Sequence, residues 1–149
     1  MIRLERIHLL SRADKLKPLR HFVRDLAEKQ GCCPENLDCM VMAINEGCMN
    51  VMQHAYHEQD SEEIIVEFWK DKEEFLVKIF DFAEGVDLDS IHSRDLDDIR
   101  PGGLGVHIIN QVMDSVEYKN NPSGTGNILE MRKQLNNPVV CCIDEQCKK

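Results

Sequence analysis

The sequence predicts a single α/β domain, in which helices and strands share one hydrophobic core. The chain has 149 residues, 42% of them hydrophobic, and a chain of this size encloses one core. Some segments alternate apolar with polar residues, and in others apolar residues recur every three or four positions. The first pattern is typical of strands and the second of amphipathic helices, so we expect both kinds of element in one domain.

The N-terminal half is expected to form a strand, two helices and a hairpin. Residues 2–10 alternate as in a strand, and residues 14–30 show helical spacing that ends at Gly31. A second helix is expected from Pro34 to about Tyr56, with the most regular apolar pattern in the chain. Two further alternating segments flank a short charged turn, which predicts an antiparallel hairpin of strands at 62–70 and 74–81.

A long polar segment separates this hairpin from the last elements. Residues 82–100 lack clear periodicity, and a loop of this length inside a compact domain usually has a function. The remaining expected elements are a glycine-rich helix and two strands joined by a turn, at 102–114, 115–119 and 127–135. We therefore expect one domain at 1–136 and a polar, cysteine-containing tail at 137–149.

Charge and hydropathy exclude several classes of partner. The formal net charge is −9, whereas nucleic-acid affinity depends on clustered Lys and Arg, so no nucleic-acid partner is expected and a basic protein surface is favoured instead. No segment approaches the roughly 20 apolar residues needed to cross a bilayer, and the first residues are charged where a signal peptide is apolar. The sequence thus predicts a cytoplasmic protein without membrane contact.

The seven cysteines are expected to remain thiols, because no export signal is visible and an odd number cannot pair completely. Cys141, Cys142 and Cys147 lie together in the tail. Three soft thiols could bind zinc or respond to redox state, but a fourth zinc ligand is missing and the spacing fits no standard zinc finger. We therefore assign them no metal.

The second expected helix carries an acid and an amide on an unusual face. Ile44, Cys48 and Val51 mark its core-facing side, and Glu46 lies almost opposite, among methionines. Asn50 follows Glu46 by four positions, so the two side chains are neighbours that can meet one ligand together. A lone pair of this kind also occurs on ordinary exposed helices.

The second strand of the hairpin ends in an inward-facing carboxylate. Phe75, Val77 and Ile79 share one face, and the period of two places Asp81 on it. Because burying an unpaired carboxylate costs several kcal/mol, Asp81 should meet a nucleobase amino group or a buried protein donor. Gly85, four residues later, allows a tight turn beside a ligand, although an Asp at a strand end is also a common turn former.

Two glycine-rich segments complete the set of candidate motifs. Arg100 precedes Gly103 and Gly105 at the start of the expected third helix, where backbone N–H groups and the helix dipole favour a phosphate. Gly124 and Thr125 precede the last strand, and Thr125 shares parity with inward-facing residues, so its hydroxyl is expected to face the interior. Plain connecting turns explain both segments equally well.

The order and spacing of these motifs are more specific than any one of them. The array Glu46…Asn50, Asp81…Gly85, Gly103-Leu104-Gly105 and Gly124-Thr125 resembles the N, G1, G2 and G3 boxes of the GHKL ATPase superfamily, over roughly residues 5–135. Residues 45–56 are similar to the corresponding helix of the anti-sigma-factor serine-protein kinases of the RsbW and SpoIIAB type. The resemblance implies a Bergerat fold, an α+β two-layer sandwich with a mixed, mostly antiparallel sheet and helices on one face.

The resemblance also implies a site for ATP and Mg²⁺. Asn50 would ligate Mg²⁺, Glu46 would act as general base, and Asp81 would accept the adenine amino group with help from Thr125. Residues 82–100 would form a lid. The remaining nucleotide-binding positions are the other members of the boxes and the adjacent cation: Gly85, Arg100, Gly103, Gly105 and Gly124.

One position departs from the family pattern. Ala83 stands where the G1 box usually has its first glycine. A methyl group limits backbone freedom there, which bears on adenine contacts and on lid motion.

The implied function is a serine/threonine protein kinase in a partner-switching system. It would phosphorylate a STAS-domain anti-sigma-factor antagonist, bind a sigma factor in the alternative complex, and form a homodimer. A nucleotide-gated module that sequesters its partner without kinase activity is the alternative, favoured by Ala83. A sensor histidine kinase fragment is less favoured because no phosphoacceptor helix pair precedes the domain, and an α/β scaffold without nucleotide remains open.

Overall fold

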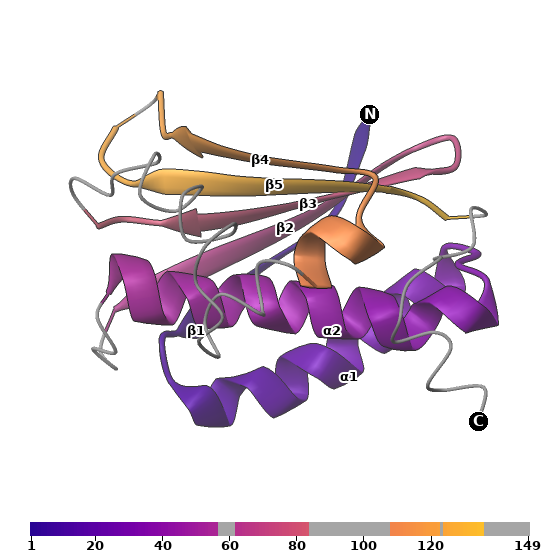
Figure 1. Ribbon diagram of the computed structural model, residues 1–149, viewed down its shortest axis with the longest axis horizontal. Coiled ribbons are helices and arrows are strands. Elements are labelled where there is room, and N and C mark those ends of the chain that lie inside the picture. Colours follow the sequence, from indigo (N-terminus) through magenta and orange to yellow (C-terminus); the bar gives the residue numbers. More distant parts are fainter. Residues whose placement is uncertain (57–61, 84–107, 123, 136–149) are drawn as a thin grey trace.

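In the part of the chain that the structure describes, five strands form one sheet, and the helices cover one of its faces (Figure 1). The computed structural model describes residues 1–56, 62–83, 108–122 and 124–135. Within these ranges, the two-layer arrangement confirms the α/β sandwich expected from the sequence. The predicted lid beyond Ala83, the start of the third helix and the tail lie outside the described residues.

The sheet is antiparallel at every strand pairing that the structure describes, in the order β1-β2-β3-β5-β4. The strand β5 therefore lies beside the hairpin of β2 and β3, and β1 and β4 form the edges of the sheet within the described residues. The register places Asp81 directly opposite Asn127. The strands are β1 (Ile2–Leu10), β2 (Glu63–Asp71), β3 (Glu74–Asp81), β4 (Ser115–Asn120) and β5 (Asn127–Gln134).

The two N-terminal helices form where the apolar periodicity predicts them. A 3₁₀ turn, η1 (Ala13–Lys15), leads into α1 (Leu16–Lys29), and α2 (Pro34–Asn50) begins with proline in its first turn, where a missing N–H costs nothing. Residues 108–112 are also helical. None of the helices in the described ranges is long and apolar enough to cross a bilayer.

The second helix changes its geometry before it ends. The α-helical bonding stops at Asn50, and the chain continues through a π-helical turn, η2 (Val51–Ala55). The N–H of Tyr56 closes this turn on the carbonyl of Val51 at 3.1 Å. The continuous helix expected to about Tyr56 is thus an α-helix followed by a wider turn, which is a frequent feature of functional sites.

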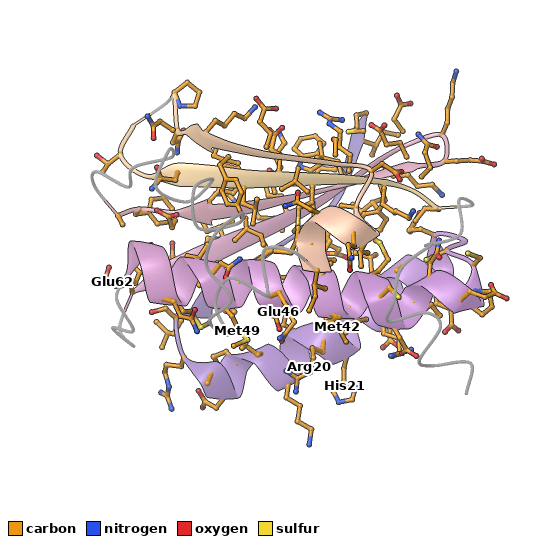
Figure 2. All side chains as sticks on the ribbon, viewed as in Figure 1. Arg20, His21, Met42, Glu46, Met49 and Glu62 are labelled. Carbon is orange, nitrogen blue, oxygen red and sulfur yellow. The ribbon has the colours of Figure 1, made fainter. Side chains whose placement is uncertain are left out.

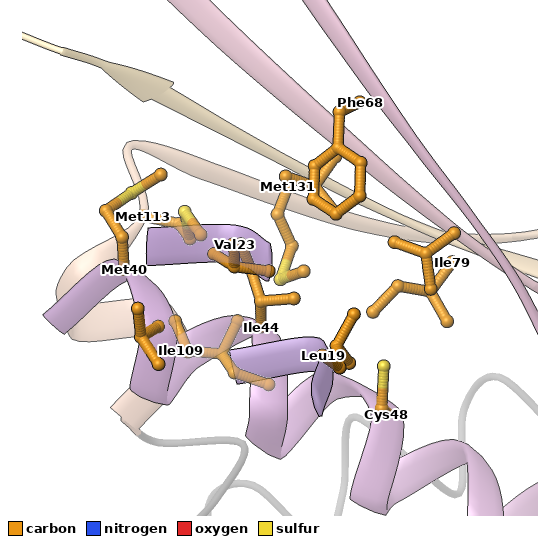
Figure 3. Packing of buried hydrophobic residues seen from close by; sticks show 14 of the residues in the cluster. Leu19, Val23, Met40, Ile44, Cys48, Phe68, Ile79, Ile109, Met113 and Met131 are labelled. Carbon is orange, nitrogen blue, oxygen red and sulfur yellow. The ribbon is translucent and has the colours of Figure 1, made fainter. Parts of the chain in front are cut away.

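The core lies between the helices and the inner face of the sheet (Figure 3). Ile44 and Cys48 on α2 are fully buried, as the helical wheel predicts. The ring of Phe68 on β2 lies 5.7 Å from that of Phe22 on α1 and 6.1 Å from that of Phe75 on β3. These aromatic contacts, one tilted and one edge-to-face, connect α1 to the centre of the sheet.

Gly47 allows α2 to approach the sheet closely. A Cβ atom at this position would lie 2.8 Å from Cδ1 of Ile79 and 3.2 Å from Cδ2 of Leu129, which is closer than packed carbon atoms tolerate. The helix therefore lies against β3 and β5 at Gly47. Asn50 follows three residues later, about 4.5 Å further along the helix axis.

Candidate functional site

Glu46 lies on the side of α2 that borders α1, between Met42 and Met49 (Figure 2). Its side chain and that of Met49 are partly buried, and Met42 is 36% exposed. Burial raises the pKa of the Glu46 carboxyl above its usual value. The position of this acid between methionines is as the sequence predicts.

Asn50 is only 5% exposed, and its side-chain nitrogen is buried without a hydrogen-bond partner among the described residues. Buried polar atoms are normally satisfied, so an unpartnered amide beside Glu46 indicates a place for a ligand. The nitrogen can donate to a phosphate oxygen, and the oxygen of the same amide is a hard ligand suited to Mg²⁺. This chemistry fits Mg-ATP.

No group of three metal-ligating His, Cys, Asp or Glu side chains occurs in the part of the chain that the structure describes. A Mg²⁺ ion held at Asn50 would therefore rely on few protein oxygens. Mg²⁺ commonly binds in this way, with substrate phosphates and waters completing its octahedral shell.

Asp81 closes β3 with its carboxylate buried, at 4% exposure, which confirms the inward orientation predicted from strand parity. Asn127 Nδ2 donates to Asp81 Oδ1 at 3.0 Å, and the N–H of Ala83 donates to the same oxygen at 3.1 Å. Burial raises the pKa of Asp81, and the hydrogen bonds from Asn127 and Ala83 partly offset that rise. Of the two donors left open by the sequence, the buried protein donor is therefore present.

Sequence reasoning did not single out Asn127. One sequence feature could have identified it: Asn127 is the first residue of β5, and Asn is uncommon in strands, so an Asn there suggests a specific role. Its role depends on β5 pairing with β3, because only that pairing brings it opposite Asp81. The position of the carboxylate is thus set by two strands that are distant in sequence.

Tyr56 connects the end of η2 to the start of β2 and to the residue that follows Asp81. Its hydroxyl donates to the carbonyl of Glu63 at 2.6 Å and accepts from the N–H of Phe82 at 2.7 Å. Burial, as the largest effect, raises the pKa of Tyr56 to about 12, so the hydroxyl keeps the proton it donates. Together with the contact between Gly47 and Ile79, this bridge holds the end of the second helix beside the end of β3.

The turn before β5 differs from the sequence expectation. Thr125 is exposed, so the expectation that its hydroxyl faces the interior is wrong. The reason is the bend at 124–126, where Gly126 adopts φ +114° and interrupts the alternation of the strand. A Cβ at Gly126 would lie 2.0 Å from the carbonyl oxygen of Asp81, so this glycine lets the turn pass against the candidate site.

Ala83 does not need the freedom of a glycine. Lys72 is the only non-glycine residue with positive φ in the described ranges, so Ala83 has an ordinary backbone conformation. Gly124 is exposed. The other predicted nucleotide-binding residues lie outside the described residues: Gly85, Arg100, Gly103 and Gly105.

A two-layer sandwich with an acid and an amide on its second helix, held beside a buried carboxylate at the end of a central strand, defines a nucleotide-binding domain of the histidine-kinase type. The family model for the histidine kinase-like ATPase domain matches residues 9–133. The chain belongs to this family.

Several curated relatives of this chain carry the name serine-protein kinase RsbW. The chain is 29% identical over 130 residues to the serine-protein kinase RsbW of Halalkalibacterium halodurans, covering 82% of this chain and 77% of that protein. It is 30% identical over 134 residues to RsbW of Bacillus pumilus, with 82% and 80% covered. The Bacillus subtilis RsbW is 26% identical over 130 residues, with 82% and 79% covered.

Solved structures show the same fold. The structure of the RsbU and RsbW domains of a Mycobacterium tuberculosis protein matches 91% of this chain and 34% of that one, with a TM-score of 0.63 and 14% identity. The SiaB-SiaC complex of Pseudomonas aeruginosa matches with a TM-score of 0.60 and 14% identity, over 88% of this chain and 89% of the other. These similarities support the fold.

Proposed function

We propose that this chain is an ATP-dependent serine/threonine protein kinase of the RsbW type. It phosphorylates a hydroxyl of a STAS-domain anti-sigma-factor antagonist and, in an alternative complex, binds a sigma factor. One observation carries the proposal: Glu46 lies one helical turn from Asn50, whose buried amide nitrogen has no partner in the described residues. The names of the RsbW relatives supply the reaction class.

The nucleotide is proposed to bind between α2 and the end of β3. Asp81, oriented by Asn127, accepts the adenine amino group, and Asn50 holds Mg²⁺ through its amide oxygen. The metal, when bound, neutralises charge on the phosphates. Six further residues are proposed to contact the nucleotide: Gly85, Arg100, Gly103, Gly105, Gly124 and Thr125. Of these, Thr125 would do so from an exposed position.

Glu46 is the proposed general base. As the substrate hydroxyl oxygen forms its bond to the γ-phosphorus of ATP, its proton passes to the Glu46 carboxylate, and the bond from the γ-phosphorus to the bridging oxygen breaks to release ADP. Burial raises the pKa of Glu46, which makes its ionised form a stronger base. Positioning and charge neutralisation supply most of the remaining rate enhancement in such transfers.

The test combines nucleotide binding with phosphate transfer. Calorimetry with Mg-ATP measures binding, and labelled ATP with a purified STAS-domain antagonist measures transfer. We expect Asn50→Ala to lose Mg-ATP binding, and Glu46→Gln to keep binding while transfer falls by about 10²–10⁴-fold. Unchanged transfer in both variants would refute the assignment.

A nucleotide-gated module that sequesters its partner without phosphorylating it is the second candidate. The feature that favours it is Ala83 in place of the first glycine of the G1 box. The same experiment separates the two, because the module binds Mg-ATP and its partner but yields no labelled product. A homodimer in the cytoplasm is part of both proposals, and the dimer is tested by the sedimentation mass with and without ATP.

A further inference from the structure

A groove of about 460 Å³ lies between the start of α1 and the end of the second helix. Leu16, Met49 and Met52 give it an apolar wall, while Arg12, Ala13 and Asp14 lie along its rim. Its volume falls in the range of about 300–1,000 Å³ that is typical of ligand pockets. Methionine side chains are flexible and adapt to differently shaped apolar groups, so this wall fits a side chain rather than one rigid small molecule.

The groove opens beside the candidate general base. Met49 lines it and follows Glu46 by three residues on α2, so their Cβ atoms are about 5–6 Å apart. Figure 2 shows both side chains along the border between α1 and α2, with Arg20 of α1 nearby. A peptide side chain seated in this groove would place the adjacent residue close to Glu46.

The rim of the groove belongs to a basic segment of an acidic protein. Residues 12–24 contain five Lys or Arg and one Asp, a net charge of 5 − 1 = +4, whereas the whole chain has −9. Arg12 is paired with Asp14, and Arg24 with Asp38. Lys15, Lys17 and Arg20 make no ion pair within the described ranges, so their charges remain available to an acidic partner.

Arg20 is also held in position beside the candidate base. Its Nη1 donates to Oδ1 of Asn45 at 3.0 Å, and Nδ2 of Asn45 contacts Sδ of Met49 at 3.5 Å. Asn45 precedes Glu46 directly. These contacts therefore connect the basic segment to the wall of the groove, at the residue that precedes the acid in sequence.

We propose that this groove binds an acidic segment of the protein substrate that carries an apolar side chain next to the phosphorylated hydroxyl. The apolar side chain enters between Met49 and Met52, and flanking carboxylates meet Lys15, Lys17 and Arg20. The role of this segment as a substrate rests on the proposed kinase function. The binding itself does not depend on phosphate transfer.

Synthetic peptides test the docking directly. The probe has a Ser beside a Leu, with Glu and Asp on both sides, and two matched controls replace the Leu by Ser or the acids by Lys. In full-length protein with ¹³C-methyl methionines, we expect the probe to shift the signals of Met49 and Met52 but not those of the fully buried Met40 and Met131. Both control peptides are expected to bind at least about tenfold more weakly, equivalent to about 1.4 kcal/mol.

Two surface variants then place the binding in the groove. Ala13→Phe fills the groove from an exposed position, and Lys17→Glu reverses one charge of the basic segment. Each is expected to weaken the probe about tenfold or more, whereas Lys29→Glu, at the exposed far end of α1, should change its affinity less than about twofold. Circular dichroism and Mg-ATP calorimetry on the same samples verify that the variants are folded.

The outcomes separate this inference from the kinase proposal. Unshifted Met49 and Met52 signals, or equal binding of the Lys-substituted peptide, would overturn the docking. Phosphate transfer that is unaffected by Ala13→Phe would overturn it while leaving the kinase intact. Peptide binding at the groove in a protein that transfers no phosphate would support the docking and remove only the kinase.

Discussion

Asn127, at the start of β5, donates a hydrogen bond from Nδ2 to Oδ1 of Asp81, at the end of β3, over 3.0 Å. The two residues are 46 positions apart in sequence but directly opposite in the strand ladder. Both are buried, at 8% and 4% exposure. A carboxylate kept in such a place, with its pKa raised by burial, is costly to stability, which is typical of a group retained for binding.

Replacing Asp81 by Asn should therefore stabilise the protein while removing adenine recognition. Ionised Asp81 disfavours folding because its folded-state pKa is raised, so its contribution to stability is present below the unfolded value of about 3.9 and is lost as pH rises through the folded value. We expect Asp81→Asn to gain most over wild type near neutral pH, with the gain shrinking as the medium is acidified. Urea unfolding across pH measures this, and calorimetry should show no Mg-ATP binding. A loss of stability that is largest at neutral pH would contradict the argument.

Gly47→Ala should destabilise the contact between α2 and the sheet. The added methyl group would lie 2.8 Å from Cδ1 of Ile79, and overpacking of this kind costs about 1–3 kcal/mol. Ile79→Val deletes that atom, so the double variant should be more stable than the sum of the single effects predicts. Denaturant unfolding of the four proteins measures the coupling. Gly124→Ala, with nothing within 4 Å of the new methyl, is the control and should unfold like wild type.

Tyr56→Phe should loosen the end of β3 without changing side-chain volume. The substitution removes the hydroxyl that accepts from the N–H of Phe82 and donates to the carbonyl of Glu63, and leaving buried partners unsatisfied costs about 1–3 kcal/mol. Hydrogen exchange at the Phe82 amide should accelerate more than exchange in the middle of β3. Equal protection of this amide in both proteins would show that the bridge contributes little.

Regular elements of the site were predictable from sequence. The stripe through Ile44 and Cys48 identified the buried face of α2, and strand parity placed Asp81 inward, because helical and strand periods are properties of a local segment. The same reasoning placed Glu46 among methionines.

Features that depend on pairing or on irregular backbone were not predictable. Asn127 meets Asp81 only because β5 pairs with β3, and periodicity carries no information on strand order. Strand alternation gave the wrong orientation for the side chain of Thr125. The reason is that Gly126, with its positive φ, interrupts the regular strand between Thr125 and the start of β5. The π-turn after Asn50 also leaves no periodic signal in five residues, yet it is the segment that leads to Tyr56 and its bridge to Phe82.

The pH dependence of phosphate transfer should identify Glu46 as the base. Burial raises its pKa, and a general base acts in its ionised form, so kcat/KM should rise with pH through an acidic limb that lies above the ordinary Glu value of about 4.3. Glu46→Asp should keep an acidic limb at reduced rate, because a carboxylate remains, whereas Glu46→Gln should lose the limb together with the activity. Met42→Lys places a cation beside the carboxylate from a partly exposed position, which favours the ionised form and should move the limb to lower pH. A limb that stays in place in Met42→Lys and persists in Glu46→Gln would assign the titration to another group.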